Sequence, residues 1–389
     1  MSELENKTEI IEEIAEPVPT LVTPPVVFLV NDTYQIIFET DINAWAYAEI
    51  GGKIYKDSIN GVVRSADTFH RVTVPTSVLD DAGEYTVGFS HIADRKAYHP
   101  ASGPIVTEKR KFHAPGKNGS LKLYMLADTH SKDVASARCA SYFGDDLDLL
   151  VLCGDIANKA VSLGHIRTVH KIAESVLRGE KPCVFVRGNH DTRGACAELL
   201  PSYVGSDCGK TYFTFRVGSV WAVCLDCGED KIDTHVEYGD IADYSAFRQD
   251  QCDFLRKLIK NKACEYEAEG VMHKIAVCHV PFTIIKHDFA DNYYDQWTDS
   301  LNEIGIDVML CGHCHRIEYV KPGDDRIPDK ARANFPVVIG AKMSDNPPEA
   351  AVDPDNEFSG SAFEFLPDGG IVLKTTNSKM ETINTIKIK

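Results

Sequence analysis

The sequence predicts an α/β protein in which a small all-β domain precedes a larger domain of alternating strands and helices. Short strand-like runs separated by turn signals fill residues 26–113. From residue 121 the pattern becomes strand, loop and helix, and five of the strand-like runs end in polar side chains that can bind metal. A chain of 389 residues suits two domains better than one.

Composition and charge exclude some classes of function. Hydrophobic residues make up 43% of the chain and charged residues 25%, which is typical of a soluble globular protein. The formal net charge of -17 argues against a nucleic-acid-binding surface, because a phosphate backbone requires a positive one. A small phosphate ligand remains compatible with this charge, since a bound dication can reverse its sign locally.

The sequence gives no export or membrane signal. Residues 1–19 are acidic and polar, without the basic segment and apolar run of a signal peptide, and no apolar run could span a bilayer. We therefore expect a cytoplasmic protein without a membrane partner. Its twelve cysteines are expected to be reduced thiols. The pairs Cys224/Cys227 and Cys311/Cys314 lack the repeated short-loop context of a structural zinc site.

The N-terminal part reads as a tail followed by a β-sandwich. Residues 1–25 are expected to be an acidic tail, because four prolines between positions 17 and 25 prevent a helix. Residues 26–113 contain expected strands at 26–30, 34–40, 44–50, 71–74 and 85–90. Residues 79–85 resemble the tyrosine corner of immunoglobulin-like domains, but Val87 replaces the usual second cysteine. We predict an immunoglobulin or fibronectin type III-like sandwich that packs against the next domain.

Residues 114–120 are a linker by composition, and residues 121–389 form the expected second domain. Helical periodicity is present at 162–177 and 244–260. The expected strands are 121–127, 147–153, 183–186, 212–217, 220–225, 274–278, 308–311, 336–339, 362–365 and 371–375.

Polar side chains follow five of these strands at the point where each strand ends. They are Asp128 with His130, Asp155, Asn189 with His190 and Asp191, His279, and His313 with His315. Because the carboxyl ends of parallel strands lie at one edge of a sheet, we expect these side chains to meet there. Each piece alone is more often a turn or a histidine at the rim of a core. All five together, in this order, predict a metal site.

The residue types indicate which ions such a site would bind. Carboxylate, amide and imidazole groups form a mixed oxygen and nitrogen set, suited to Mn, Fe or Zn rather than to Mg or Ca alone. Seven ligands are too many for one ion. If one carboxylate bridges, they form two centres with four protein ligands each, which would hold two divalent or trivalent transition-metal ions.

The series Asp-x-His, Gly-Asp, Gly-Asn-His-Asp, His and Gly-His-x-His resembles the calcineurin-like metallophosphoesterase superfamily over residues 121–389. The resemblance implies a four-layer α/β/β/α sandwich, here preceded by the small all-β domain. That domain is similar in placement to the one before the catalytic domain of purple acid phosphatases. Those enzymes carry a tyrosine after the second motif's aspartate, whereas Asp155 is followed here by Ile156, Ala157 and Asn158, so we expect no tyrosinate–iron charge-transfer colour.

The resemblance also implies roles for individual residues. One ion would be held by Asp128, His130 and His315. The other would be held by Asn189, His279 and His313, and Asp155 would bridge both. His190 would donate a proton to the leaving oxygen, and Asp191 would orient His190 through a hydrogen bond.

The activity implied is hydrolysis of small phosphomonoesters or phosphodiesters by in-line attack of a metal-bound hydroxide. The alternative is a catalytically weak scaffold of the same fold that binds other proteins. Retention of His190 and Asp155 favours the enzyme. A nuclease is disfavoured by the negative charge of the chain.

Four further features are expected near the site or on the surface. His165 and His170 are expected at the surface or rim of their helix. Residues 226–244 are acidic and are expected to form a solvated loop near the mouth of the site. Residues 282–297 are rich in aromatic side chains, which either stack on a substrate or pack among themselves.

Overall fold

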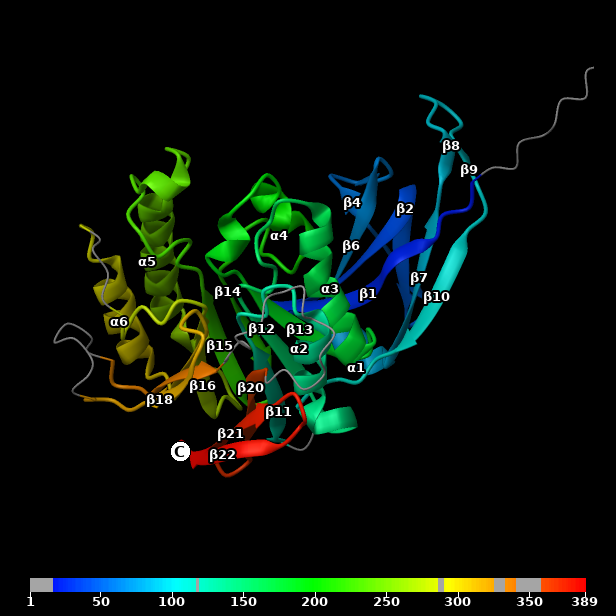
Figure 1. Ribbon diagram of the computed structural model, residues 1–389. Helices are drawn as coiled ribbons and strands as arrows, with labels where there is room; N and C mark the ends of the chain where they lie inside the picture. The colour runs from blue at the N-terminus through cyan, green and yellow to red at the C-terminus, as the bar shows by residue number, and fades with distance from the viewer. Residues whose placement is uncertain (1–16, 117–118, 286–289, 325–332, 341–357) are drawn as a thin grey trace, which may run out of the picture.

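The computed structural model describes residues 17–116, 119–285, 290–324, 333–340 and 358–389, and it has the predicted α/β class (Figure 1). Two large sheets form the centre of the molecule. The larger sheet runs in the order β10-β7-β2-β1-β13-β12-β11-β20-β21-β22, and the smaller in the order β14-β15-β16-β17-β19-β18. No helix among the described residues is long and apolar enough to cross a membrane.

The N-terminal elements lie on the right in Figure 1. Their bounds are β1 (Leu21–Val30), β2 (Thr33–Ile50), β3 (Lys53–Lys56), β4 (Ser58–Ile59), β5 (Val62–Val63), β6 (Asp67–Pro75), α1 (Thr76–Ala82), β7 (Glu84–Ser90), β8 (Ile92–Asp94), β9 (Ala101–Ser102) and β10 (Val106–Lys111).

The following elements carry the predicted site. The strands are β11 (Leu121–Leu126), β12 (Leu149–Cys153), β13 (Pro182–Val186), β14 (Phe213–Val217), β15 (Val220–Leu225), β16 (His273–Cys278), β17 (Val308–Cys311), β18 (Ile317–Val320), β19 (Val337–Gly340), β20 (Ser359–Phe365), β21 (Ile371–Asn377) and β22 (Thr382–Lys387). The helices are α2 (Asp133–Ala140), α3 (Leu163–Leu177), α4 (Leu200–Tyr203), α5 (Tyr244–Lys260) and α6 (Tyr293–Ile304).

The expected four layers are present. Helices α2 and α3 pack on the outer face of the larger sheet, where Tyr124 and Leu152 share a core with Ile166. The two sheets face each other over a second core. Helices α5 and α6 cover the smaller sheet through a third core that includes Trp297 and Leu255. Each sheet therefore buries both faces, which explains why its central strands are continuous apolar runs.

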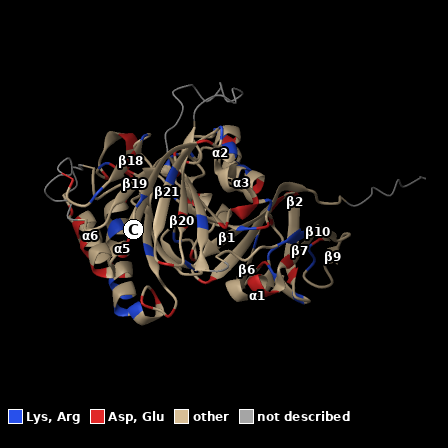
Figure 2. Ribbon diagram, turned by 90° about the horizontal axis from the view of Figure 1, so that it is seen from below, with Lys and Arg blue, Asp and Glu red and all other residues tan. Residues whose placement is uncertain are grey.

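Parallel pairing sets the position of the strand ends. Strands β11, β12 and β13 are parallel neighbours in the larger sheet, and β15, β16 and β17 are parallel neighbours in the smaller one. Their carboxyl ends lie at a common edge of the two stacked sheets. In Figure 2 both acidic and basic residues colour parts of the ribbon at α5, α6, β7 and β10.

In the aromatic stretch at 282–297, the described side chains of Phe282, Tyr294 and Trp297 pack among themselves. Helix α6 begins within it, and Tyr294 and Trp297 are buried in the core under this helix. Phe282 contacts both rings, with centroid distances of 5.1 and 5.3 Å. The alternative prediction, that these three side chains stack on a substrate, is therefore wrong. Residues 286–289 of the stretch lie outside the described residues.

The expected N-terminal tail ends earlier than predicted. Strand β1 begins at Leu21, so the prediction is wrong for residues 21–25, whereas residues 1–16 lie outside the described residues. Pro24 and Pro25 are tolerated because the pairing of β1 with β2 is irregular between Thr23 and Val26. A proline fits such an irregular position, since no ladder hydrogen bond requires its missing N–H.

Hydrogen bonding continues across the predicted boundary between the two domains. Strand β1 pairs in parallel with β13, so one sheet includes strands from both sides of the boundary. The side-chain amide of Gln35 donates to the carbonyl of Ser206 and accepts from its backbone N–H. Arg167 of α3 makes two hydrogen bonds to Glu39 of β2. The division into domains stays a prediction, and the contacts show two parts that are joined over a wide surface.

His170 differs from its predicted position at the rim. It is 1% exposed, with its ring against Phe28 and Phe69 and its Nε2 2.6 Å from the carbonyl oxygen of Tyr203. Burial lowers its pKa to about 4. His170 lies on the apolar face of α3, which packs into the core. Its assignment to a helix did not show on which face it would lie.

The burial of His170 predicts a loss of stability in mild acid. The unfolded imidazole binds a proton near pH ~6.5 whereas the folded one does not, so the free energy of unfolding falls as pH is lowered from that value toward about 4. The expected contribution is about 2 kcal/mol between about pH 7 and about pH 5. Urea unfolding at both pH values checks it. His170→Gln, which keeps a donor for Tyr203, should lose this part of the pH dependence; an unchanged dependence would contradict the prediction.

Candidate metal centre

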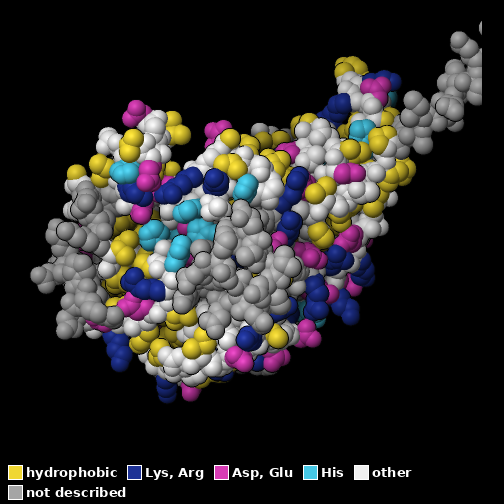
Figure 3. Space-filling model, viewed as in Figure 1, with side chains coloured by type: hydrophobic (Ala, Val, Ile, Leu, Met, Phe, Trp, Pro, Cys, Tyr) yellow, Lys and Arg dark blue, Asp and Glu magenta, His cyan; other side chains and the backbone are white. Residues whose placement is uncertain are grey.

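Five strand ends deliver the predicted residues to one place. Strand β11 leads into Asp128 and His130, β12 into Asp155, β13 into Asn189 and His190, β16 into His279, and β17 into His313 and His315. Figure 3 shows histidine side chains gathered at the centre of one face, with Lys and Arg side chains beside them. The structure therefore brings the predicted residues of all five motifs together.

The backbone at these strand ends is held in an unusual conformation. Five of the predicted residues have positive φ values: Asp128 (51°), His130 (43°), Asp155 (54°), His313 (69°) and His315 (50°). Side chains other than glycine rarely adopt such angles, each costing roughly 1–2 kcal/mol, and they accumulate at functional sites. Backbone bonds from the N–H of Asp128 to Gly154 and from that of His130 to Asp155, both 3.0 Å, maintain the arrangement.

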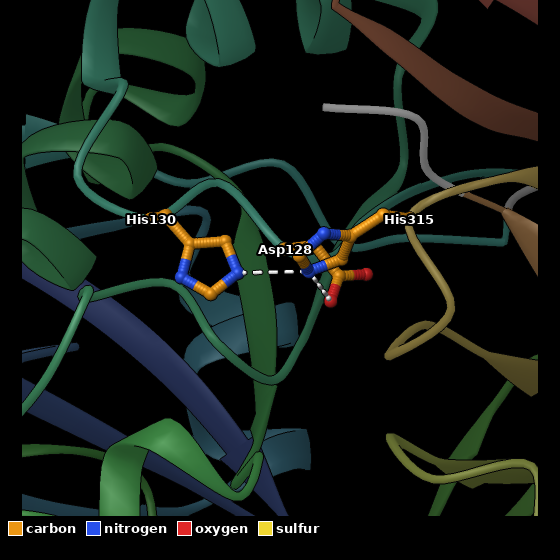
Figure 4. Close-up of side chains that lie close together, drawn as sticks. All are labelled: Asp128, His130 and His315. Carbon is orange, nitrogen blue, oxygen red and sulfur yellow. Dashed lines mark hydrogen bonds and ion pairs between the residues drawn. The ribbon is translucent and has the colours of Figure 1, made fainter. Parts of the chain in front are cut away.

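Asp128, His130 and His315 form the first group (Figure 4). The Nε2 atoms of the two histidines lie 3.1 Å apart, and the Nε2 of His315 lies 3.4 Å from Oδ1 of Asp128. One atom from each residue lies within 4.8 Å of the others, so all three can bind a single ion. Burial lowers the pKa of His130 to about 4, which keeps its imidazole neutral and able to donate a lone pair.

Asp155, His279, Asn189 and His313 form the second group. Nδ1 of His279 lies 2.7 Å from the carbonyl oxygen of Cys153 and donates to it. Its Nε2 then points to Oδ2 of Asp155 at 3.2 Å. Nδ1 of His313 lies 3.0 Å from Oδ1 of Asn189. These contacts come from four different strand ends.

The His279 environment tests whether a cation fits. Its Nε2 is buried and faces two carboxylates, Oδ2 of Asp155 at 3.2 Å and Oδ1 of Asp128 at 3.8 Å. Burial opposes the charged form of this imidazole, but Asp155 and Asp128 outweigh it and raise its pKa to about 10. The two carboxylates and the ring therefore require a positive charge between them. A metal ion bound by the Nε2 lone pair would supply it, so the donor set fits.

His190 is placed as expected, but its orienting partner is not. Its side chain is 30% exposed, and its Nε2 lies 4.0 Å from Oδ2 of Asp155. Its Nδ1 lies 2.8 Å from the carbonyl oxygen of Asn158, which fixes the ring. The prediction that Asp191 orients His190 is wrong, because Oδ2 of Asp191 instead accepts from the backbone N–H groups of Gly188 and Asp155.

Asp191 thus stabilises the backbone of the site and does not contact the ring of His190 through a hydrogen bond. It is 1% exposed, and burial together with the nearby Asp155 raises its pKa to about 7. Its two backbone hydrogen bonds fix the turn after β12 against the turn after β13. A motif can place Asp191 in the chain, but the partner of its carboxylate depends on how the two turns approach each other.

The acidic stretch at 226–244 is only partly a solvated loop. Asp226 and Glu229 are both fully buried, so the prediction is wrong for these two residues. Asp226 accepts from Arg187 and Glu229 from Arg193. Farther along, Oδ2 of Asp230 lies 3.6 Å from Nε2 of His313, which places this part beside the site. The signal in the sequence was the pair of arginines on either side of the Gly-Asn-His-Asp motif.

Comparison with known proteins identifies the family to which the chain is similar. A family profile described as calcineurin-like phosphoesterase matches residues 121–316. The serine/threonine-protein phosphatase CPPED1 of Mus musculus is 26% identical over 180 residues, which span 43% of this chain and 53% of that protein. The match thus covers about half of that relative's length.

Two solved structures share the fold. The purple acid phosphatase PPD1 of yellow lupin (Lupinus luteus) superposes with a TM-score of 0.57 at 11% identity, covering 94% of this chain and 74% of that one. A structure of PhoD gives a TM-score of 0.52 at 10% identity, covering 94% and 91%. At these identities the likeness concerns the fold, including most of the N-terminal part.

Asp155 offers a direct test of the two-ion arrangement. Its carboxylate lies between both groups, so Asp155→Asn should remove a ligand from each ion and lower the metal bound per chain. Metal analysis after dialysis against Mn²⁺ or Zn²⁺ measures this loss. Lys374→Gln, remote from the strand ends, is the control. Full metal content in the Asp155 variant would remove this carboxylate from the bridging position.

Proposed function

The chain belongs to the calcineurin-like phosphoesterase family, and we propose that it hydrolyses small phosphomonoesters or phosphodiesters at a dinuclear metal centre. The observation that carries the proposal is the convergence of five strand ends on one buried edge, where Nε2 of His279 lies 3.2 Å from Oδ2 of Asp155 and 3.8 Å from Oδ1 of Asp128. Two buried carboxylates around one imidazole need a compensating positive charge, which supports a bound cation.

We assign the two ion positions from the two groups of side chains. Asp128, His130 and His315 would hold one ion. Asn189, His279 and His313 would hold the other, with Asp155 between them. Two such cations would lower the pKa of a water molecule and balance the charge on the phosphoryl oxygens. Mn, Fe and Zn suit this mixture of carboxylate and imidazole ligands.

His190 supplies the proton in this proposal. With Nδ1–H bonded to the carbonyl of Asn158, Nε2 faces the edge at which the strand ends meet. A protonated Nε2 can donate to the leaving oxygen as the ester bond breaks. The side chain of His190 is 30% exposed and that of Asp155 is 1% exposed, so in this proposal His190 would lie between solvent and the ions.

The substrate is proposed to be a small phosphorylated compound. The net charge of -17 disfavours nucleic acids. The name of the mouse relative, a serine/threonine-protein phosphatase, justifies a phosphopeptide as an additional test substrate. Asp155 is followed by Ile156, Ala157 and Asn158 and not by a tyrosine, so the loaded protein should show no tyrosinate–iron charge-transfer colour.

The proposal is tested by hydrolysis of p-nitrophenyl phosphate and bis-p-nitrophenyl phosphate after chelation and again after addition of Mn²⁺ or Zn²⁺. Chelation should abolish turnover and metal should restore it, because the proposed nucleophile is a metal-bound hydroxide. The ratio of the two rates separates a monoesterase from a diesterase. Metal-loaded protein that hydrolyses neither ester nor a phosphopeptide would refute the proposal and favour the scaffold.

His190→Ala should separate metal binding from turnover. The ring is not needed to hold an ion, so the variant should keep its metal while turnover falls by about 10²–10⁴-fold, the usual contribution of a positioned acid. Metal analysis and steady-state kinetics on the same samples measure both. Unchanged turnover would exclude His190 as the proton donor.

A further inference from the structure

The motif that carries Asn189 and His190 is fastened at both ends by buried carboxylates. Arg187 precedes the motif, and its Nε donates to Oδ2 of Asp226 at 2.7 Å. Arg193 follows it, and its Nε and Nη2 donate to the two oxygens of Glu229 at 2.5 and 2.8 Å. Asp226 and Glu229 belong to one short segment directly after β15, so a strand of the smaller sheet holds a turn that belongs to the larger sheet.

Glu229 is the centre of this contact. Besides the two bonds from Arg193, its carboxylate accepts from the hydroxyls of Thr192 and Tyr238, both at 3.1 Å. Its side chain is fully buried, and a buried carboxylate is tolerated only when it is paired and hydrogen-bonded. Four donors satisfy that demand. Arg193 and Thr192 come from the turn that begins at His190, so this turn is fixed relative to β15.

The opposite side of the same turn is fixed by the segment after β12. The Asn158 carbonyl accepts from Nδ1 of His190, and the N–H of Ala160 donates to the carbonyl of Arg193 at 2.7 Å. The Thr192 hydroxyl also lies 2.7 Å from the carbonyl oxygen of Asn189, so its single proton is shared between that oxygen and the carboxylate of Glu229. The turn that carries the His190 ring is therefore hydrogen-bonded on two sides. Asn158 and Ala160 bind it on one side, and Glu229 binds it on the other.

We propose that Glu229 is a positioning residue that holds His190 in line with the leaving oxygen by binding Arg193 and Thr192. This inference rests on the proposed function, because it concerns the proton that His190 gives to the leaving group. Glu229 itself need not touch the substrate. Loss of its charge should loosen the turn on the Arg193 side while the contact with Asn158 remains.

The test compares two substrates that differ in their need for a proton. Phenyl phosphate releases a more basic leaving group than p-nitrophenyl phosphate and depends more on the acid. Glu229→Gln should therefore lower kcat on phenyl phosphate by about 10- to 100-fold more than on p-nitrophenyl phosphate. A residue that acted only on stability would lower both rates together. Metal content should remain that of the wild type.

A second readout does not need activity. Hydrogen–deuterium exchange of residues 190–193 should accelerate in Glu229→Gln, since Thr192 and Arg193 lose partners. Glu237→Gln is the matched control. Glu237 comes from the same loop and lies 3.8 Å from the same guanidinium, but its side chain is 48% exposed. An exposed ion pair contributes little, so this variant should match the wild type in exchange and in both rates.

The outcomes are distinct. Faster exchange together with the changed substrate ratio supports the proposal, and an unchanged ratio overturns it even if exchange accelerates. Loss of metal in Glu229→Gln would overturn it as well, by showing that Glu229 supports Asn189 instead. If this variant does not fold, Arg193→Lys removes the two-pronged contact and should give the same ratio. Wild-type protein inactive on both esters would refute the proposed function, while exchange would still show whether Glu229 holds the turn.

Discussion

The site depends on the close approach of two stacked sheets at the carboxyl ends of their parallel strands. Glycines make this approach sterically feasible. A Cβ at Gly154 would lie 2.5 Å from the ring of His279, which comes from the other sheet. A Cβ at Gly312 would lie 2.7 Å from Oδ2 of Asp128. Larger residues at either position would separate the sheets, and side chains from both could no longer meet at one site.

Residues that follow buried strands were predictable from the sequence, because a strand end fixes where its next side chains go. That is why Asp128, Asp155 and His279 were placed correctly at one edge. Partners between loops were not predictable in the same way. Asp191 accepts from Asp155 and Glu229 accepts from Arg193, and each bond joins two separate turns. No local sequence pattern shows which turns will lie side by side.

The N-terminal part shows the same limit at the level of the fold. Alternation of apolar and polar residues predicted its strands. It could not predict that β1 pairs with β13, because that pairing joins segments far apart in the sequence. Arg71 donates to the carbonyls of Pro201 in α4 and of Val204 directly after it, both at 2.6 Å. Tyr85, which resembled a tyrosine corner, donates to the carbonyl of Gly179 across the predicted boundary instead of to its own strand. The N-terminal strands therefore support the surroundings of the site as well as their own core.

A gradient of exposure across the site gives the direction of approach for a substrate. Asp128 and His279 are almost completely buried, whereas the side chains of His190 and His315 are 30% and 43% exposed. The carboxylates thus lie deepest, where low polarity strengthens their attraction for cations. His190 and His315 lie toward solvent, on the side from which a substrate could reach the site. In the proposed reaction a proton donor at His190 would be renewed from water after each turnover, while Asp128, Asp155 and His279 lie buried beneath it.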